Sequence, residues 1–236
     1  MPDQPATKTV MVVGAHPDDP EFGAAGTVAR WVQQGWMAVY VLCTNGDKGS
    51  SDPTMTSERL AVIREAEQRK AAAIVGAREV VFLGCHDGGL EDTPEFRGQI
   101  VRLIRKHRPD IVMTHDPWRR YMVHRDHRIA GQVTLDAVFP YSRDRLFYPE
   151  HEAESLKPHK VLEVYLFGAE TPDTVVEIED TLGTKMKAIA CHVSQVGDHT
   201  ADWDKWVKEY RERMSRMNKR QDQPMAELFR RIELRR

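Results

Sequence analysis

Residues near the start of the chain combine the side chains of a metal site with those of an acid–base catalyst. His16, Asp18, Asp19 and Glu21 stand within six residues, directly after an apolar run at residues 9–15. Carboxyl groups this close repel one another unless a cation offsets their charge, and imidazole with carboxylate is a normal ligand mixture for Zn²⁺. We expect His16 and Asp19 to converge on one ion while Asp18 points to a different side.

A second group of such residues, His124-Arg125-Asp126-His127, follows far along the chain. A His-x-x-His pair at the start of a helix places both rings on nearly the same face, where one can bind a metal and the other can act beside it as an acid or an electrostatic group. Asp126 could orient either ring through a hydrogen bond. Three protein ligands plus water make a catalytic zinc site, whereas a structural site needs a fourth ligand.

Strands and helices must bring these two groups together. Short apolar runs alternate with helical patterns along the chain. The expected strands are residues 9–15, 37–43, 79–83, 110–114, 161–167 and 174–178, and the expected helices are residues 57–74, 96–106, 126–138 and 181–190, with one more around residues 27–32. This alternation predicts an α/β fold with a doubly wound, mainly parallel sheet and helices on both faces. In the strand order 3-2-1-4-5, the carboxyl ends of strands one and four flank the switch point where such sheets bind ligands.

The end of the chain differs in composition from the rest. After residue 196 it is strongly charged, with Trp203, Trp206 and Tyr210 followed by a basic segment. We expect a helix whose aromatic side packs on the same domain or on a neighbouring subunit. The sequence therefore predicts one domain at residues 1–195 and a C-terminal helical extension at residues 196–236.

The composition argues against several classes of partner. Lys and Arg number 34 and Asp and Glu number 36, so the formal charge of −2 gives no electrostatic reason to expect nucleic acid or an anionic membrane. No apolar run approaches the roughly 20 residues that cross a bilayer, and the first residues lack the layout of a secretory signal. Three widely spaced cysteines indicate neither a disulfide framework nor a thiolate zinc site. We expect a cytoplasmic protein that acts on a small molecule.

Several ordered motifs resemble those of the PIG-L/LmbE-like N-deacetylases, over about residues 8–195. The motifs are Ala-His-Pro-Asp-Asp-Pro-Glu-Phe-Gly (15–23), Thr-Asn-Gly-Asp-Lys-Gly (44–49), Arg-x-x-Glu (64–67), Asp87, His-Arg-Asp-His (124–127) and His-Val-Ser-Gln (192–195). The resemblance implies a Rossmann-like fold and zinc-dependent removal of an N-acetyl group from an amino sugar or a sugar conjugate. It also implies a homo-oligomer, because members of this family are often trimers or hexamers.

The resemblance implies roles for the residues that match these motifs. The residues that resemble the family's metal ligands, for one Zn²⁺ per subunit, are His16, Asp19 and His127. Asp18 resembles the general base. His124 resembles the group that stabilises or protonates the tetrahedral intermediate, with Asp126 as its partner.

Other residues are candidates for contact with the substrate. Arg64, Asp47 and Asp87 resemble residues near the substrate in the family, although the family often has Glu at the position of Asp47, so this carboxylate reaches about one methylene less far. His192 could reach the site from a later helix, as a substrate contact or behind one, or could simply pack in the core. Tyr121 lies one residue away from the place where some members have a tyrosine before the His-x-x-His pair.

The sequence leaves alternatives open. His115 lies even closer to the end of the fourth strand and is a rival metal ligand or a residue of the crevice wall, and another divalent ion could replace zinc. The substrate could be a non-sugar amide or a thiol conjugate. A nucleotide- or sugar-binding Rossmann-like protein without catalysis is the rival from another class. Against nucleotide binding, Gly-x-Gly-x-x-Gly is absent after the first strand, and Asp18 and Asp19 would repel a pyrophosphate.

Overall fold

The computed structural model describes residues 7–219 and 223–235, which contain a seven-stranded sheet in the order β3-β2-β1-β4-β5-β7-β6. The strands are β1 (Thr9–Gly14), β2 (Met37–Thr44), β3 (Glu79–Cys85), β4 (Ile111–His115), β5 (Glu163–Phe167), β6 (Thr174–Glu177) and β7 (Ala226–Glu233). Neighbouring strands among β1 to β5 are parallel, and β7 is antiparallel to both β5 and β6. The predicted order 3-2-1-4-5 and the doubly wound α/β fold are therefore confirmed.

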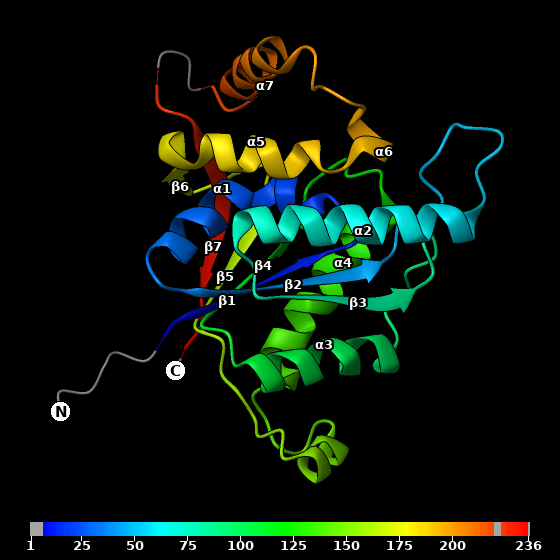
Figure 1. Cartoon of the computed structure of the whole chain (residues 1–236). Coiled ribbons are helices and arrows are strands. Elements are labelled where there is room, and N and C mark those ends of the chain that lie inside the picture. The colour runs from blue at the N-terminus through cyan, green and yellow to red at the C-terminus, as the bar shows by residue number, and fades with distance from the viewer. Residues whose placement is uncertain (1–6, 220–222, 236) are drawn as a thin grey trace.

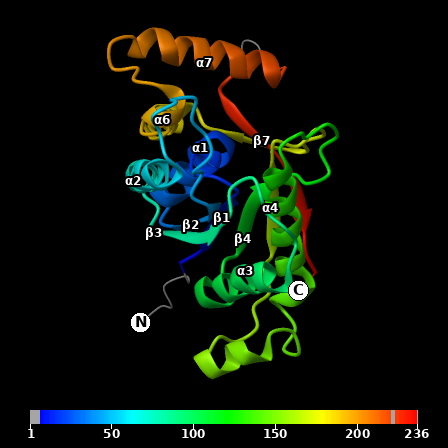
Figure 2. The ribbon, with the colours of Figure 1, turned by 90° about the vertical axis from the view of Figure 1, so that its right-hand side faces the viewer.

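Helices cover both faces of this sheet (Figure 1). One face carries α1 (Asp19–Gln33), α2 (Ser57–Val75) and α5 (Leu182–Ala190), and the other carries α3 (Pro94–His107) and α4 (Arg125–Asp136). A further helix, α7 (Trp203–Met217), lies outside α5 (Figure 2). Shorter helical segments are η1 (Ala137–Tyr141), η2 (Pro149–Glu154), η3 (Glu179–Thr181) and α6 (Val193–Val196). None of the helices in the described ranges is both long and apolar enough to cross a membrane.

Strand β1 shows how the sequence builds a core on each face. Val10 and Val12 pack in the cluster that includes apolar residues of α1 and α2, whereas Met11 and Val13 pack in the cluster with residues of α3 and α4. All four side chains are fully buried. A strand between two helical layers needs apolar residues on both sides, which explains why residues 9–15 form a continuous apolar run instead of an alternating one.

Strand β7 corrects the prediction for the end of the chain. The expected helix exists as α7, but residues 226–233 enter the sheet between β5 and β6, so residues 196–236 are not simply a helical extension. The apolar pattern of the sequence does not indicate this strand, because the strand carries a charged residue, Glu227, at a buried position. Lys185 Nζ lies 2.6 Å from Glu227 Oε1, and two backbone N–H groups of α1 also donate to this carboxylate.

The sheet positions two segments at one edge. β1 and β4 are neighbours, with Val12 opposite Met113, so their carboxyl ends lie side by side. The chain leaves β1 at residues 15–18 and enters α1, while the segment after β4 leads into α4. This is the switch point of the sheet, where parallel α/β folds bind their ligands.

Candidate metal centre and active site

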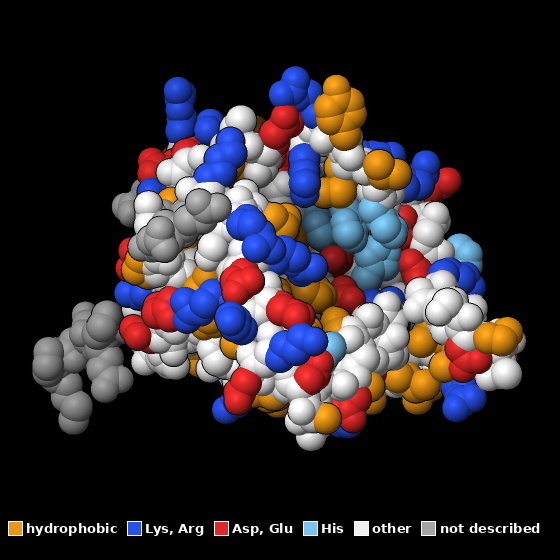
Figure 3. Space-filling model, turned by 90° about the horizontal axis from the view of Figure 1, so that it is seen from above, with side chains coloured by type: hydrophobic (Ala, Val, Ile, Leu, Met, Phe, Trp, Pro, Cys, Tyr) orange, Lys and Arg blue, Asp and Glu red, His pale blue; other side chains and the backbone are white. Residues whose placement is uncertain are grey.

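The two histidine-containing segments meet at this edge of the sheet. His16 Nδ1 lies 3.2 Å from His127 Nε2, and Asp19 reaches both rings, with Oδ2 3.6 Å from His16 Nδ1 and Oδ1 3.4 Å from His127 Nε2. Seen from above, the histidine rings form one accessible patch with acidic side chains beside it (Figure 3). The structure thus brings together all three residues that resemble the family's metal ligands.

The geometry of these three groups fits a divalent cation. Ligand atoms about 2.1 Å from a tetrahedral ion lie about 3.4 Å from one another. The separations here, 3.2, 3.4 and 3.6 Å, are close to this value, with a different oxygen of Asp19 facing each of the two rings. Two imidazole nitrogens and one carboxylate form the ligand set of a catalytic zinc site. In the described residues, three sets place one ligand atom per residue within 4.8 Å of one another: His16 with His124 and His127, Asp19 with His115 and His127, and His16 with Asp87 and Asp126.

The far side of the His16 ring is held by carboxylates. His16 Nε2 lies 3.1 Å from Asp87 Oδ1 and 3.2 Å from Asp126 Oδ2, which leaves Nδ1 facing Asp19 and His127. Burial by itself lowers the pKa of His16, but hydrogen bonds to Asp19 and Asp87 outweigh it and raise the pKa to about 10. Burial raises the pKa of Asp87, but the hydrogen bond from His16 outweighs this effect and the pKa falls to about 2. A carboxylate behind a metal-binding histidine is the usual way to fix the ring.

Asp126 has a different partner from the one predicted. The resemblance pairs it with His124, but its carboxylate faces His16 and accepts the N–H groups of Gly88 and Leu90 at 2.7 and 3.2 Å. The reason is the direction of side chains on α4. His124 and His127 stack on one face with ring centroids 4.5 Å apart, whereas Asp126 between them points to the loop after β3.

His115 contacts the metal cluster through Asp19. Its Nε2 lies 3.0 Å from Asp19 Oδ2, and its ring stacks on that of His127 with centroids 4.1 Å apart. Burial raises the pKa of Asp19, but the facing histidines, His115 first, outweigh it and hold this pKa well below its usual range. At His127, burial dominates and lowers the pKa to about 4.

Asp18 occupies an unusual backbone conformation. It precedes α1 with φ 98° and ψ −26°, in the left-handed region, and its side chain makes no capping hydrogen bond to the helix. Such a conformation costs a residue with a side chain roughly 1–2 kcal/mol, so surrounding contacts must maintain it. Burial and the nearby charge of Asp19 raise the pKa of Asp18 to about 7, against the lowering effect of Arg64.

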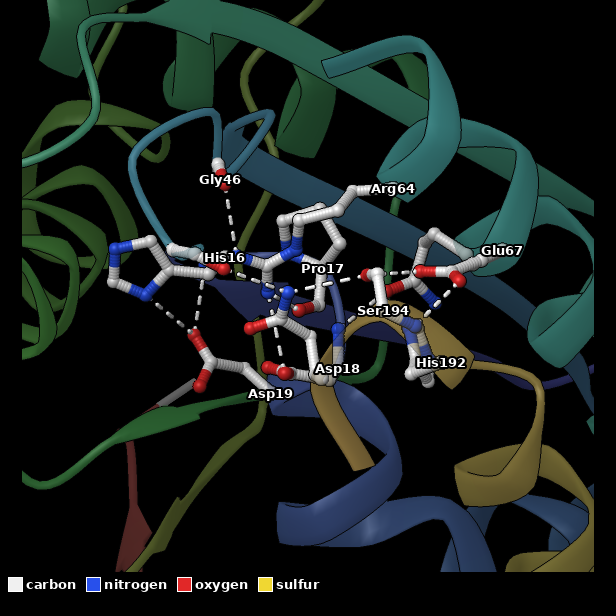
Figure 4. A network of polar contacts seen from close by, with 12 residues as sticks. His16, Pro17, Asp18, Asp19, Gly46, Arg64, Glu67, His192 and Ser194 are labelled. Atoms are coloured by element: carbon white, nitrogen blue, oxygen red, sulfur yellow. Dashed lines mark hydrogen bonds and ion pairs between the residues drawn. The ribbon is translucent and has the colours of Figure 1, made fainter. Parts of the chain in front are cut away.

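Arg64, predicted near the substrate, is buried beside Asp18 (Figure 4). Its Nη2 donates to Asp18 Oδ2 at 3.2 Å and to Pro17 O at 2.5 Å, and its Nη1 donates to Gly46 O at 2.9 Å. A Cβ atom on Gly46 would lie 2.3 Å from Arg64 Nη1, so a larger residue at this position would force the guanidinium of Arg64 to move. Arg64 therefore joins the segment after β1 to the loop after β2.

The remaining predicted substrate residues differ in their surroundings. Asp47 is half-buried on the loop after β2 and accepts a hydrogen bond from Lys48 Nζ at 3.0 Å, while Asp87 accepts the backbone N–H of Lys48. His192 has no exposed surface, and its Nε2 lies 3.2 Å from Glu21 Oε2. Of the alternatives left open for His192, direct contact with the substrate does not fit this fully buried position.

Sequence reasoning missed Gln68 as part of the site. Its Oε1 accepts the backbone N–H of Asp18 at 2.9 Å, and its Nε2 donates to Glu21. A signal existed, because Gln68 follows Arg64 by four residues and so lies on the same face of α2. Nearby, Glu67 accepts hydrogen bonds from the backbone N–H and hydroxyl of Ser194, which attaches α6 to α2 (Figure 4).

The chain is similar to several known proteins. The sequence model of the family described as PIG-L: GlcNAc-PI de-N-acetylase matches residues 11–138, which contain the whole histidine cluster. The chain is 34% identical to the diacetylchitobiose deacetylase of Thermococcus kodakarensis, over 84% of this chain and 73% of that protein. It is 30% identical to the probable N-acetyl-alpha-D-glucosaminyl L-malate deacetylase 2 of Bacillus anthracis, over 79% of this chain and 80% of that protein.

A solved structure shows the same fold. The N,N'-diacetylchitobiose deacetylase of Pyrococcus horikoshii superposes with a TM-score of 0.87 at 29% identity, and the match covers 97% of this chain and 85% of that one. These three relatives, two found by sequence and one by structure, are all named deacetylases. The chain belongs to the PIG-L family of de-N-acetylases.

Proposed function

We propose that this deacetylase hydrolyses the N-acetyl group of a small amino sugar or amino-sugar conjugate, with one Zn²⁺ per subunit. The observation that carries the proposal is the convergence of His16, Asp19 and His127 within 3.2–3.6 Å, with the carboxylate of Asp18 on the adjoining residue. A protein that only binds a metal does not need an acidic residue with a strained backbone beside its metal ligands. The names of the two relatives support an acetylated amino sugar as substrate.

His16, Asp19 and His127 would hold the ion. When bound, a divalent metal polarises the amide carbonyl and lowers the pKa of water. Asp18 is the base in this proposal: it accepts a proton from the water that attacks the carbonyl carbon. Arg64 holds the Asp18 carboxylate in place through the contact at 3.2 Å.

His124 completes the acid–base pair. Its exposed ring shares a face of α4 with His127 and lies with its centroid 4.6 Å from that of His16. A positively charged or donating group here stabilises the oxygen of the tetrahedral intermediate. The C–N bond then breaks, a proton from Asp18 or His124 goes to the leaving nitrogen, and the products are acetate and a free amine.

The surroundings of this site complete the proposal. Arg64 contacts Asp18, Asp87 contacts His16, and Asp47 is joined to Lys48 on the loop after β2. These three residues are the candidates for holding sugar hydroxyls, directly or through the residues that they orient. We further propose that the protein works in the cytoplasm as a homo-oligomer, a trimer or a hexamer, as the family resemblance implies. Light scattering of the purified protein tests the oligomeric state.

Metal analysis together with a substrate screen tests the function. The purified protein should contain one equivalent of zinc and should release free amine from N-acetylglucosamine, from its disaccharide or from a sugar–inositol conjugate. Removal of the metal by a chelator should abolish this release, and added Zn²⁺ should restore it. Release from thiol-conjugate or non-sugar amides alone would assign the alternative amidase function. A fully loaded protein that hydrolyses none of these compounds would contradict the proposal.

A further inference from the structure

Two side chains of α2 hold the peptide bond of Asp18 from opposite sides. Arg64 Nη2 donates to the carbonyl oxygen of Pro17 at 2.5 Å, and the N–H of Asp18 donates to Gln68 Oε1 at 2.9 Å. The peptide group is planar, so these contacts bind both polar ends of one rigid unit. The plane cannot turn about the chain without breaking one of them. Figure 4 shows Arg64 beside Pro17 and Asp18.

This restraint matters because Asp18 is in the left-handed region, with φ 98°. For a residue with a side chain this conformation is unfavourable, and the relaxed alternatives would turn the carboxylate to a different direction. The side chain makes no capping bond to α1 that would hold it instead. The direction of the proposed base therefore depends on the contacts to its own peptide group, together with the contact of Arg64 to its carboxylate at 3.2 Å.

The contact from Gln68 works only in one orientation of its amide. An amide can present either oxygen or nitrogen, and only the oxygen can accept the N–H of Asp18. Gln68 Nε2 donates to Glu21 Oε1 and Oε2 at 2.9 and 3.1 Å, and Glu21 Oε2 also faces His192 Nε2 at 3.2 Å. All three side chains are fully buried, so water does not compete for these groups. The pair of Glu21 and His192 thus selects the orientation that Asp18 requires.

We propose that Gln68 is a positioning residue for Asp18, and that Glu21 and His192 act behind it by fixing its amide. The inference rests on the proposed function, in which Asp18 is the base. It gives His192 a place in the site without contact with substrate. It also gives Glu21 a reason to be buried, since a carboxylate is the group that accepts from both neighbours at once.

The test uses the full-length, zinc-loaded protein and an N-acetylated amino sugar that it hydrolyses. Gln68→Met keeps the length of the side chain and removes both hydrogen bonds. We expect kcat to fall about 10- to 100-fold, because a misplacement of about 1 Å in an active site costs about 10²-fold. KM and zinc content should stay close to those of the wild type, whereas Tm should fall, because the N–H of Asp18 and the carboxylate of Glu21 lose a buried partner. Gln132→Met is the matched control. It removes a hydrogen bond to Asp136 near the C-terminal end of α4, away from the site histidines at the start of that helix, and should keep the wild-type kcat.

An exchange variant keeps the proposal testable if Gln68→Met does not fold. In Glu21→Gln with Gln68→Glu, the amide at position 21 can donate to the carboxylate at position 68 and accept from His192. The carboxylate can still accept the N–H of Asp18. The double variant should therefore have a higher kcat than Glu21→Gln or Gln68→Glu alone, which a general loss of packing would not produce.

Separate results would overturn the two proposals. A kcat of Gln68→Met within about twofold of the wild type, or a loss seen only in KM or zinc content, would exclude positioning of the base. So would an exchange variant no more active than either single substitution. A wild-type protein that releases no amine from any N-acetylated sugar would instead overturn the proposed function.

Discussion

His115 Nε2 lies 3.0 Å from Asp19 Oδ2, so the proposed carboxylate ligand has a histidine partner. The same Asp19 oxygen lies 3.6 Å from His16 Nδ1, and the other oxygen lies 3.4 Å from His127 Nε2. Asp19 is therefore surrounded by three imidazoles.

His115→Phe should weaken metal binding while leaving the fold intact. Phenylalanine can keep the stacking on His127, but it cannot hold the Asp19 carboxylate. Loss of a group that orients a ligand typically lowers metal affinity about 10- to 100-fold. Competition with a zinc chelator of known affinity measures the change. His107→Phe, on α3 away from the cluster, is the control, and equal zinc affinity of the two variants would refute a role of His115 at the site.

Asp18→Asn and Asp19→Ala should fail in different ways. Asp18→Asn should keep zinc and lose about 10²- to 10⁴-fold in kcat, because an amide cannot accept the proton from water. Asp19→Ala should lose zinc, because it removes a ligand. Metal analysis and initial rates on the same preparations separate the two outcomes. Wild-type turnover by Asp18→Asn would show that another residue is the base.

Gly46→Ala should displace Arg64. The added Cβ would lie 2.3 Å from Arg64 Nη1, and the residue also has φ +68°. Gly35→Ala is a matched control, because Gly35 has φ +88° with nothing within 4 Å of the added Cβ. Both variants should lose about 1 kcal/mol of unfolding free energy from backbone strain. Only Gly46→Ala should also lose kcat, and equal rates for the two would argue against Arg64 as a support for Asp18.

Lys185→Met should destabilise the fold by about 3–5 kcal/mol, because it leaves the Glu227 carboxylate buried without its cation. The two groups lie 2.6 Å apart and both are buried. Lys185→Met with Glu227→Gln should recover part of this loss, since no buried charge is then left unpaired. Urea unfolding measures the three free energies. A double variant as unstable as Lys185→Met would indicate that packing, and not charge, is responsible.

The same pair predicts a dependence on alkaline pH. Burial lowers the pKa of Lys185, but the Glu227 charge outweighs it and raises the pKa above the ordinary 10.5. A raised pKa in the folded state means that the pair stabilises the fold fully below about pH 10.5, and that this contribution is lost as pH rises through the folded-state pKa. The stability difference between the wild type and Lys185→Met should shrink in that range. The prediction would be contradicted if the difference in unfolding free energy between the two proteins did not change with pH until Lys185 was fully deprotonated.

Local patterns in the sequence were sufficient for strands β1 to β6, for the longer helices and for the segments that make the site. Continuous apolar runs such as residues 9–15 occur where a strand lies between two helical layers, and the strand order follows from a small number of allowed connections. Residues 16–19 follow β1, and residues 124–127 lie at the start of α4. Their meeting at the switch point was therefore predictable before any coordinates.

Tertiary structure alone decided which side chains face one another. Asp126 pairs with His16 instead of His124, His192 lies below the surface, and Gln68 binds the backbone of Asp18, because each contact joins segments from different parts of the chain. Strand β7 could not be predicted from the sequence for the same reason. Its buried Glu227 reads as a surface residue until Lys185 of α5 is placed beside it. Sequence spacing determines which face of an element a residue occupies, but the partner on that face belongs to another element, and only packing brings it there.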